Sequence, residues 1–259
     1  MKPQNKILLT FDVEEFDLPL EFKLPIETSE QFNIGKSGTD IVEKILLEAN
    51  IEATLFTTAN FALQFPADIK RLSEKHEIAS HSFYHTGFKK EDLLNSRLTL
   101  EEITGTRVEG FRMPRLKPIE LQWIKDAGYS YDASINPTYI PGRYNLRHLP
   151  RTVYSQEDFI RVPCSVTPNF RLPLFWLSFK NLPYPVYKML ALQTLRKDGY
   201  LSLYFHPWEF TDISQFKLPA YLKRRSGPKL QERLKEFIKD LKQEGEFCSM
   251  NTFLKKMPG

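Results

Sequence analysis

Short apolar runs alternate along this chain with longer stretches of helical periodicity, and this alternation is the feature that most constrains its fold. The pattern is typical of βα units around a parallel sheet, because parallel neighbours need a long crossover connection. We therefore expect an α/β fold, a distorted (β/α) barrel of about seven parallel strands. The predicted strands lie near residues 7–12, 53–57, 78–82, 108–112, 130–134, 159–162 and 201–205.

The predicted helices occupy the stretches between these strands, near residues 38–49, 61–75, 91–104, 119–127 and 184–197. A later helix has the clearest pattern, since its apolar residues recur on one face. These residues are Leu230, Leu234, Phe237, Ile238 and Leu241. A chain of 259 residues suits one large domain, which we place over residues 1–259.

Between residues 136 and 185 the helix–strand rhythm weakens and prolines recur, which predicts a proline-rich loop insertion. Residues 172–179 within it are unusually apolar for a loop. We expect this segment to form a lid over the end of the barrel, with Phe175 or Trp176 near the functional site. A contact with a membrane or a partner is the alternative.

Two acidic residues, Asp12 and Glu14, end the first predicted strand, and two histidines, His81 and His85, end the third. Imidazoles four residues apart can face the same way on a helical turn, and a carboxylate can complete one face of a divalent metal site. Active sites of α/β barrels gather at the carboxyl ends of the strands. The pattern favours metal-assisted hydrolysis, with a solvated or packed histidine pair as the alternative.

Composition argues against several other classes of protein. The 36 basic and 32 acidic residues are too balanced for a surface that follows phosphates, so we expect no nucleic-acid partner. Cys164 and Cys248 are expected to be small buried residues rather than a disulfide. The first residues lack a signal-peptide pattern, and no run approaches the ~20 apolar residues of a membrane span. We therefore expect a cytoplasmic protein, either free or peripheral to a membrane.

Five clusters of residues, taken in order, resemble the signatures of the polysaccharide deacetylases, carbohydrate esterase family 4, which have the NodB-homology fold. The clusters are residues 10–14 (TFDVE), 81–85 (HSFYH), 110–115 (GFRMPR), a looser match at 132–134 (DAS), and 203–210 (LYFHPWEF). The resemblance implies a NodB-type barrel that removes N-acetyl groups, with O-acetyl groups as the alternative, from an amino sugar. That sugar would belong to a polysaccharide, a peptidoglycan or a glycan precursor.

The resemblance also implies roles for the first two signatures. In the family an aspartate of the first signature is the general base, and a second acidic residue binds a metal together with two histidines. The commonest form has adjacent aspartates, whereas Val13 stands in the second place here. Strand alternation puts Asp12 and Glu14 on one face. Asp12 is thus the expected base, and one divalent ion is expected on Glu14, His81 and His85. Zinc is the expected ion, with cobalt, nickel and manganese as alternatives.

A leaving amine must be protonated before it departs, and His206 is the candidate acid, with a structural histidine as the alternative reading. Arg112 is expected to hold Asp12 by a charge-assisted bond. Asp132 is expected either to orient His206 or to form a structural ion pair with Arg112. Side chains near the barrel rim are expected to bind substrate, namely Tyr84, Pro114, Arg115, Trp176 and Trp208. Glu15 is expected to be solvated or salt-bridged, and His76 and His148 to lie on the surface or in loops.

Two other functions stay open at this point. One is an allantoinase-like amidohydrolase that opens a small cyclic amide or ureide. The other is an inactive glycan-binding module, which has no need for the full set of acid, base and metal-binding residues present here. The sequence leaves the oligomeric state undetermined.

Overall fold

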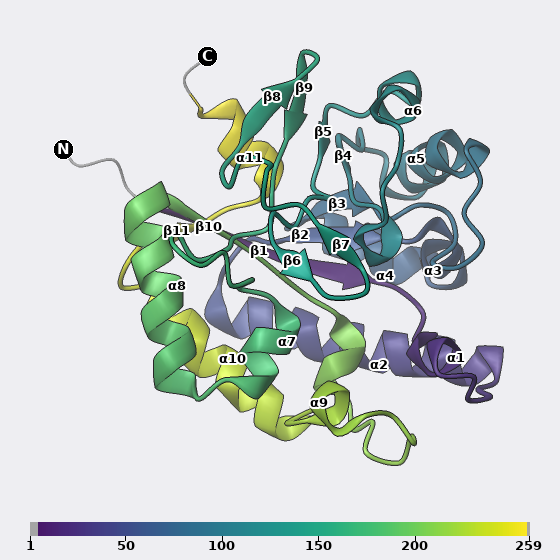
Figure 1. Cartoon of the computed structure of the whole chain (residues 1–259). Helices are drawn as coiled ribbons and strands as arrows, with labels where there is room; N and C mark the ends of the chain where they lie inside the picture. Colours follow the sequence, from purple (N-terminus) through teal and green to yellow (C-terminus); the bar gives the residue numbers. More distant parts are fainter. Residues whose placement is uncertain (1–4, 258–259) are drawn as a thin grey trace.

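The computed structural model describes residues 5–257, which fold around a largely parallel sheet that curls into half a barrel (Figure 1). The strand order is β10-β1-β2-β3-β4-β5-β9-β8, and neighbours pair in parallel except β8 and β9. The predicted distorted barrel of NodB type is confirmed. Its parallel strands are those expected from the sequence: β1 (Lys6–Val13), β2 (Thr54–Thr57), β3 (Glu77–Ser80), β4 (Gly110–Phe111), β5 (Tyr131–Asp132), β9 (Phe159–Arg161) and β10 (Tyr200–Phe205).

The chain that follows β9 runs along the edge of β10 that does not pair with β1, without forming a regular strand. The backbone N–H of Ser165 donates to the carbonyl of Ser202 at 2.9 Å, and the Ser165 hydroxyl accepts from the N–H of Ser202 at 2.8 Å. These bonds satisfy buried backbone groups of β10 that the sheet leaves unpaired. The curled sheet is thus partly closed by a loop.

Several short strands were not predicted from the sequence. They are β8 (Tyr154–Gln156), which pairs with β9 in antiparallel fashion, β11 (Glu246–Phe247) beside β1, and the hairpin of β6 (Tyr139–Ile140) and β7 (Tyr144–Asn145). Strands of two or three residues carry too little periodicity to be recognised in a sequence.

The predicted helices are present, with two corrections. Pro66 divides the helix expected over 61–75 into two, because a proline in a helix interior lacks the N–H that the backbone ladder needs. The helix expected over 38–49 begins already at Thr28. The helices are α1 (Leu18–Glu21), α2 (Thr28–Ala49), α3 (Ala59–Gln64), α4 (Pro66–Ser73), α5 (Glu91–Thr104), α6 (Leu121–Asp126), α7 (Trp176–Asn181), α8 (Tyr184–Asp198), α9 (Ala220–Lys223), α10 (Pro228–Leu241) and α11 (Met250–Lys255), with 3-10 turns η1 (Pro114–Leu116) and η2 (Pro207–Phe210).

Two glycines explain why α2 lies so close to the carboxyl ends of the strands. A Cβ atom at Gly35 would collide with the backbone oxygen of Glu14, and one at Gly38 would collide with that of Pro207. Glycine weakens a helix interior, and these two residues obscured the first half of α2 in the sequence pattern. Their absence of side chains lets α2 pack directly beneath two segments that carry predicted site residues.

The predicted loop over 136–185 is more ordered than expected, since it contains the β6–β7 hairpin, β8, β9 and α7. Its apolar segment behaves as the predicted lid. Leu174, Phe175 and Phe179 are buried, and α7 begins at Trp176. The apolar side chains of this segment are therefore buried against the core of the protein itself.

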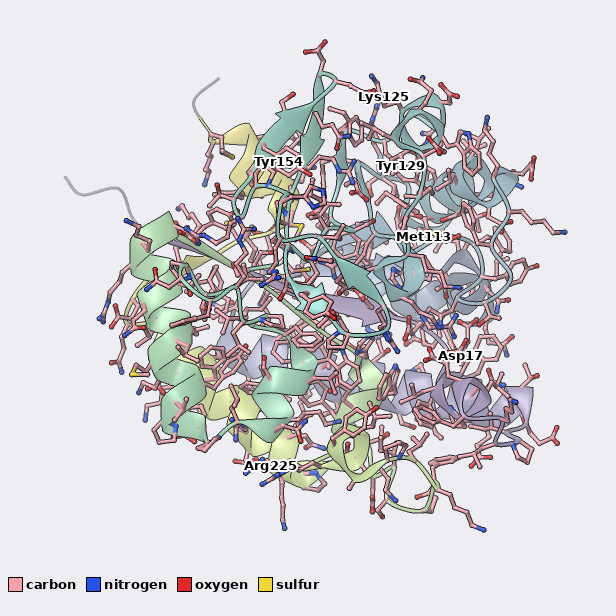
Figure 2. The ribbon with its side chains drawn as sticks, viewed as in Figure 1. Asp17, Met113, Lys125, Tyr129, Tyr154 and Arg225 are labelled. Atoms are coloured by element: carbon pink, nitrogen blue, oxygen red, sulfur yellow. The ribbon has the colours of Figure 1, made fainter. Side chains whose placement is uncertain are left out.

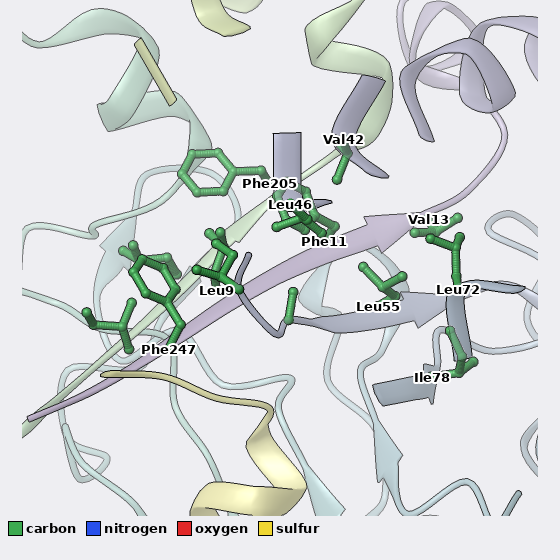
Figure 3. Close-up of a cluster of buried hydrophobic side chains, with 14 of the residues drawn as sticks. Leu9, Phe11, Val13, Val42, Leu46, Leu55, Leu72, Ile78, Phe205 and Phe247 are labelled. Atoms are coloured by element: carbon green, nitrogen blue, oxygen red, sulfur yellow. The ribbon is translucent and has the colours of Figure 1, made fainter. Parts of the chain in front are cut away.

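Side chains of β1 alternate between two environments. Leu9, Phe11 and Val13 point into the apolar layer that includes Val42 and Leu46 of α2 (Figure 3). The intervening residues, Thr10 and Asp12, are buried on the opposite face of the strand, and Glu14 follows at its end. The apolar layer fixes the register of β1, and this register directs the acidic side chains toward the barrel interior.

Cys164 and Cys248 are buried and unpaired, as predicted. Across residues 5–257, each helix is too short or too polar to cross a bilayer.

Candidate active site

The side chains of Glu14, His81 and His85 meet where β1 and β3 end. His81 Nε2 lies 3.2 Å and His85 Nε2 lies 3.1 Å from Glu14 Oε2, and all three residues are buried. The spacing of the histidines predicted a shared helical turn, but they lie on a loop after β3. Ser82 has a φ of 68° there, and this left-handed turn brings the two rings to a centroid distance of 5.7 Å. These ligand atoms all lie within 4.8 Å of one another.

Hydrogen bonds on the far sides of both rings fix their orientation. His81 Nδ1 lies 2.9 Å from the carbonyl oxygen of Arg112, and His85 Nδ1 lies 2.7 Å from Asp17 Oδ1. Both partners accept, so each Nδ1 donates, and each Nε2 presents a lone pair when its ring is neutral. Glu14 Oε2, which faces these lone pairs, has no hydrogen-bond donor among the described residues. A buried carboxylate and two imidazole lone pairs aimed at one point fit a divalent cation.

Burial alone would raise the pKa of Glu14, but the neighbouring imidazoles of His85 and His81 hold that pKa well below its usual range. Burial would also lower the pKa of His85, whereas the charges of Glu14 and Asp17 raise it to about 9. A cation bound at this site therefore has to displace a proton from His85 at neutral pH.

Asp12 and Arg112 form a buried ion pair at the ends of β1 and β4. Arg112 Nη1 donates to Asp12 Oδ1 at 2.6 Å and to the hydroxyl of Thr10 at 2.9 Å, and the guanidinium stacks on Phe56. The second oxygen, Asp12 Oδ2, lies 3.9 Å from Nε2 of both His81 and His206. One oxygen of Asp12 is thus held in place, while the other faces the site.

His206 follows β10 and lies between two tryptophan rings. Trp208 stacks on it at a centroid distance of 4.9 Å, and Trp176 presents its edge at 5.1 Å. Its Nδ1 lies 3.1 Å from Glu209 Oε1, and its backbone N–H donates to the same oxygen at 2.9 Å. Burial would lower the pKa of His206, but the Glu209 hydrogen bond and the charge of Glu14 outweigh it and raise the pKa. His206 can therefore carry a proton at neutral pH.

Asp132 does not take either of its expected roles. Its carboxylate lies 3.0 Å from Arg161 Nε and accepts from the hydroxyl of Ser134. The register of β5 and β9 places Asp132 directly opposite Arg161, which accounts for this pairing. Within the described residues it is Glu209 that contacts His206, and Asp12 that pairs with Arg112.

One further expectation is wrong, and another holds only for the loop position of the residue. Glu15 is buried rather than solvated, and its carboxylate accepts from the side chains of Thr58 and Asn60. His76 lies in a bend, as expected for a loop residue, but it is buried, and burial lowers its pKa to about 4.

A cavity of about 320 Å³ opens above these groups. Polar side chains, including Asp12, Glu14, Asp17, His85 and His206, reach it from the strand ends. Its walls are aromatic and aliphatic and come from the apolar segment 172–179, from β10 and from the elements around them. The wall residues include Leu18, Phe22, Leu116, Ile140, Phe175, Trp176, Leu177, Tyr204, Trp208, Tyr221 and Leu222.

Three of the five predicted substrate-binding residues line this cavity, namely Arg115, Trp176 and Trp208. Trp208 also donates from Nε1 to Glu14 Oε1 at 3.1 Å, so it orients a metal-ligand candidate. Tyr84 and Pro114 are not among the lining residues. Tyr84 packs on its neighbour Phe83 with almost half of its surface exposed, and Pro114 is buried at the start of η1.

Sequence reasoning missed Asp17 and Glu209. Asp17 lies just before α1 (Figure 2), where it binds His85, Thr86 and Arg115. A lone acidic residue after a strand end carries no distinctive signal. Glu209 did carry a recognisable signal. It lies three residues after His206, the residue that precedes the turn η2, and a carboxylate at that position is part of the capping-box pattern.

We predict that Asp17→Asn weakens metal binding by about 10–100-fold, the usual effect of losing a carboxylate that orients a ligating histidine. The amide can donate to His85 as well as accept from it, so the ring loses its fixed orientation. Competition with a chromophoric chelator measures the affinity. Glu14→Ala, which removes a ligand itself, is the reference: it should weaken metal binding further, and its effect on metal binding should exceed its effect on folding. Equal affinity for Asp17→Asn and the wild type would show that Asp17 does not orient His85.

Comparison with known proteins gives one family match and several matches in fold. A family model described as polysaccharide deacetylase matches residues 1–131. No curated protein matches the chain. A putative polysaccharide deacetylase from Mycobacterium smegmatis has 18% identity and a TM-score of 0.66, with 98% of this chain and 90% of that chain covered.

Two further solved structures share the fold. Puue allantoinase has 15% identity and a TM-score of 0.69, with 96% of this chain and 89% of that chain covered. A CE4 family pseudoenzyme from Bacillus anthracis has 14% identity and a TM-score of 0.53, with 98% of this chain and 66% of that chain covered. At these identities the likeness establishes the fold, and the activity has to be argued from the site itself.

Proposed function

The chain belongs to the polysaccharide deacetylase family, and we propose that it is a metal-dependent hydrolase that removes the acetyl group from the nitrogen of an amino sugar. The observation that carries the proposal is the meeting of two sets of groups in one cavity. Asp12 and His206 face each other across 3.9 Å, directly beside the cluster of Glu14, His81 and His85. Hydrolysis of an amide needs a base, an acid and an electrophile close together, and this set provides all three.

Glu14, His81 and His85 would hold the divalent ion. When bound, such an ion supplies a Lewis acid that polarises the acetyl carbonyl and makes water more acidic. Two imidazoles and one carboxylate suit zinc, and cobalt, nickel and manganese are the alternatives.

Asp12 is proposed as the general base. Arg112 donates to Oδ1, so Oδ2 is the oxygen left to accept the proton of the attacking water. As the water oxygen bonds to the acetyl carbon, the carbon–nitrogen bond weakens. His206 is proposed as the acid that protonates this nitrogen through Nε2, and the products are acetate and the free amine.

The aromatic walls of the cavity support a sugar as the substrate. Trp176 is partly exposed in the cavity beside His206 and can contact a pyranose, whereas Trp208 is buried and stacks on His206. The unpaired, buried Cys164 and Cys248 suit a reducing compartment. A cytoplasmic glycan precursor, carried by a lipid or a nucleotide, is therefore part of the proposal.

Metal analysis of the purified protein, paired with an acetate-release screen on acetylated chitooligosaccharides, tests the proposed function. Bound metal and acetate release that a chelator abolishes would support a deacetylase. Hydrolysis of a cyclic ureide without acetate would identify an allantoinase-like amidohydrolase instead. Glycan binding with neither activity would identify a silent binding module, but the presence of Asp12, His206 and the three ligand candidates argues against that outcome.

We expect Trp176→Ala to raise KM for a long or lipid-linked acceptor by about three- to tenfold, the value of one aromatic contact. A minimal acetylated monosaccharide should be almost unaffected, since it reaches less of the wall. Steady-state kinetics on the two substrates measures the difference. Leu177→Ala, which alters the same wall without removing a ring, is the control. Equal changes for both substrates would mean that Trp176 is only structural.

A further inference from the structure

The carboxylate of Glu209 is fully buried behind His206 and away from the cavity. Its Oε1 accepts from the backbone N–H of His206 at 2.9 Å and lies 3.1 Å from the ring Nδ1. Its other oxygen, Oε2, is 3.3 Å from Nζ of Lys180, which comes from α7. Glu209 therefore lies between the candidate acid and a lysine of the apolar segment 172–179 and its helix.

Lys180 has no exposed surface, and its surroundings hold the ammonium in one position. Nζ donates to the carbonyl of Leu222 at 2.6 Å and to the hydroxyl of Ser226 at 2.9 Å. Burial lowers the pKa of Lys180, while the charge of Glu209 opposes this effect. A buried lysine is costly unless it is paired. The carboxylate of Glu209 offsets the free-energy cost of burying the Lys180 ammonium, and the same carboxylate contacts His206.

The charge of Glu209 decides which nitrogen of a neutral His206 carries the hydrogen. An ionised carboxylate only accepts, so it requires Nδ1–H and leaves Nε2 as the nitrogen that exchanges protons with the cavity. The tautomer therefore depends on where the Glu209 carboxylate is held, and Lys180 faces its second oxygen.

We propose that Lys180 is a positioning residue that holds the Glu209 carboxylate in place, so that Glu209 keeps His206 in the Nδ1–H tautomer. Other charged and titratable groups face His206 as well, namely Asp12 and Glu14 from β1 and Tyr204 from β10. They approach from the cavity or from the flank, whereas Lys180 acts through Glu209. The kinetic consequence rests on the proposed function, but the tautomer itself does not.

Nitrogen-15 NMR of the histidine side chains tests the proposal, because the shifts of Nδ1 and Nε2 distinguish the two tautomers without any substrate. The chain has 5 histidines, and the signals lost in His206→Gln assign the residue. Spectra are recorded on the zinc-loaded protein above the pKa of His206. The wild type should show Nδ1–H. In Lys180→Gln, and in Lys180→Met as a second neutral variant, the ammonium no longer holds the Glu209 carboxylate against Nδ1, so a substantial share of the hydrogen should move to Nε2.

Two controls separate charge from packing. Lys180→Arg keeps the charge and should restore the Nδ1–H signature, while Ser226→Ala removes one anchor of Lys180 and should leave the signature unchanged. If either neutral variant folds and retains Nδ1–H, Lys180 does not select the tautomer and the proposal is wrong. In the deacetylase assay the neutral variants should lose about 10²-fold in kcat with KM almost unchanged. A tautomer change in an enzyme without deacetylase activity would uphold this inference and refute the proposed function alone.

Discussion

Asp12→Asn should lower kcat for acetyl-amide hydrolysis by about 10²–10⁴-fold, the usual contribution of a positioned general base. Asparagine keeps the shape of the side chain, and its oxygen can still accept from Arg112 Nη1. Its amide nitrogen, however, cannot take up a proton from water. Metal content should survive the change, because Glu14, His81 and His85 are untouched. Initial rates and metal analysis on the same preparation measure both quantities.

The variant also removes the negative partner of a fully buried arginine, so it will cost stability as well as activity. Asp132→Asn is the matched control, since it too leaves a buried arginine, Arg161, without its carboxylate. We expect both variants to unfold at a lower temperature, but only Asp12→Asn to lose kcat per folded molecule. If the two variants lost kcat equally, Asp12 would be a structural ion-pair partner rather than the base.

Much of the fold could be predicted from the sequence because its information is local. The longer strands are short apolar runs that are buried on both faces, and α10 buries one apolar stripe, so these patterns were sufficient. Helix α2 was cut short in the prediction, which began it at residue 38, because glycines at 35 and 38 weaken the helical pattern there. Their function is tertiary, since they admit the backbone at Glu14 and Pro207, and no local pattern encodes that contact.

The same distinction applies to the candidate site. Glu14, His81 and His85 could be identified because their residue types and positions at strand ends resemble a known pattern, and the structure brings their ligand atoms together. Asp132 was misjudged because its partner depends on the register between β5 and β9. Lys180 was missed because a lysine is expected on the surface from sequence alone, and only the packing of α7 shows that it is buried.

His206→Ala should separate substrates by their leaving groups. The departing nitrogen of an acetyl amide is a poor leaving group, so it needs a proton, and the raised pKa of His206 favours the protonated ring that can supply it. An activated acetate ester departs without a proton. We expect a loss of at least about 10²-fold in kcat for the amide and a much smaller loss for the ester.

The pH profile gives the second signature of the same change. In the wild type the amide rate should fall as pH rises through the pKa of His206, because the acid is then deprotonated. It should also fall at low pH, where the base and the metal-ligand candidates take up protons. His206→Ala should flatten the alkaline limb and keep the acidic one. Trp208 stacks on this ring and also bonds Glu14, so metal content must be measured in the variant to exclude indirect loss of the ion. Equal losses for amide and ester at full metal content would mean that His206 binds substrate or supports the site, and the proton would have to come from another group.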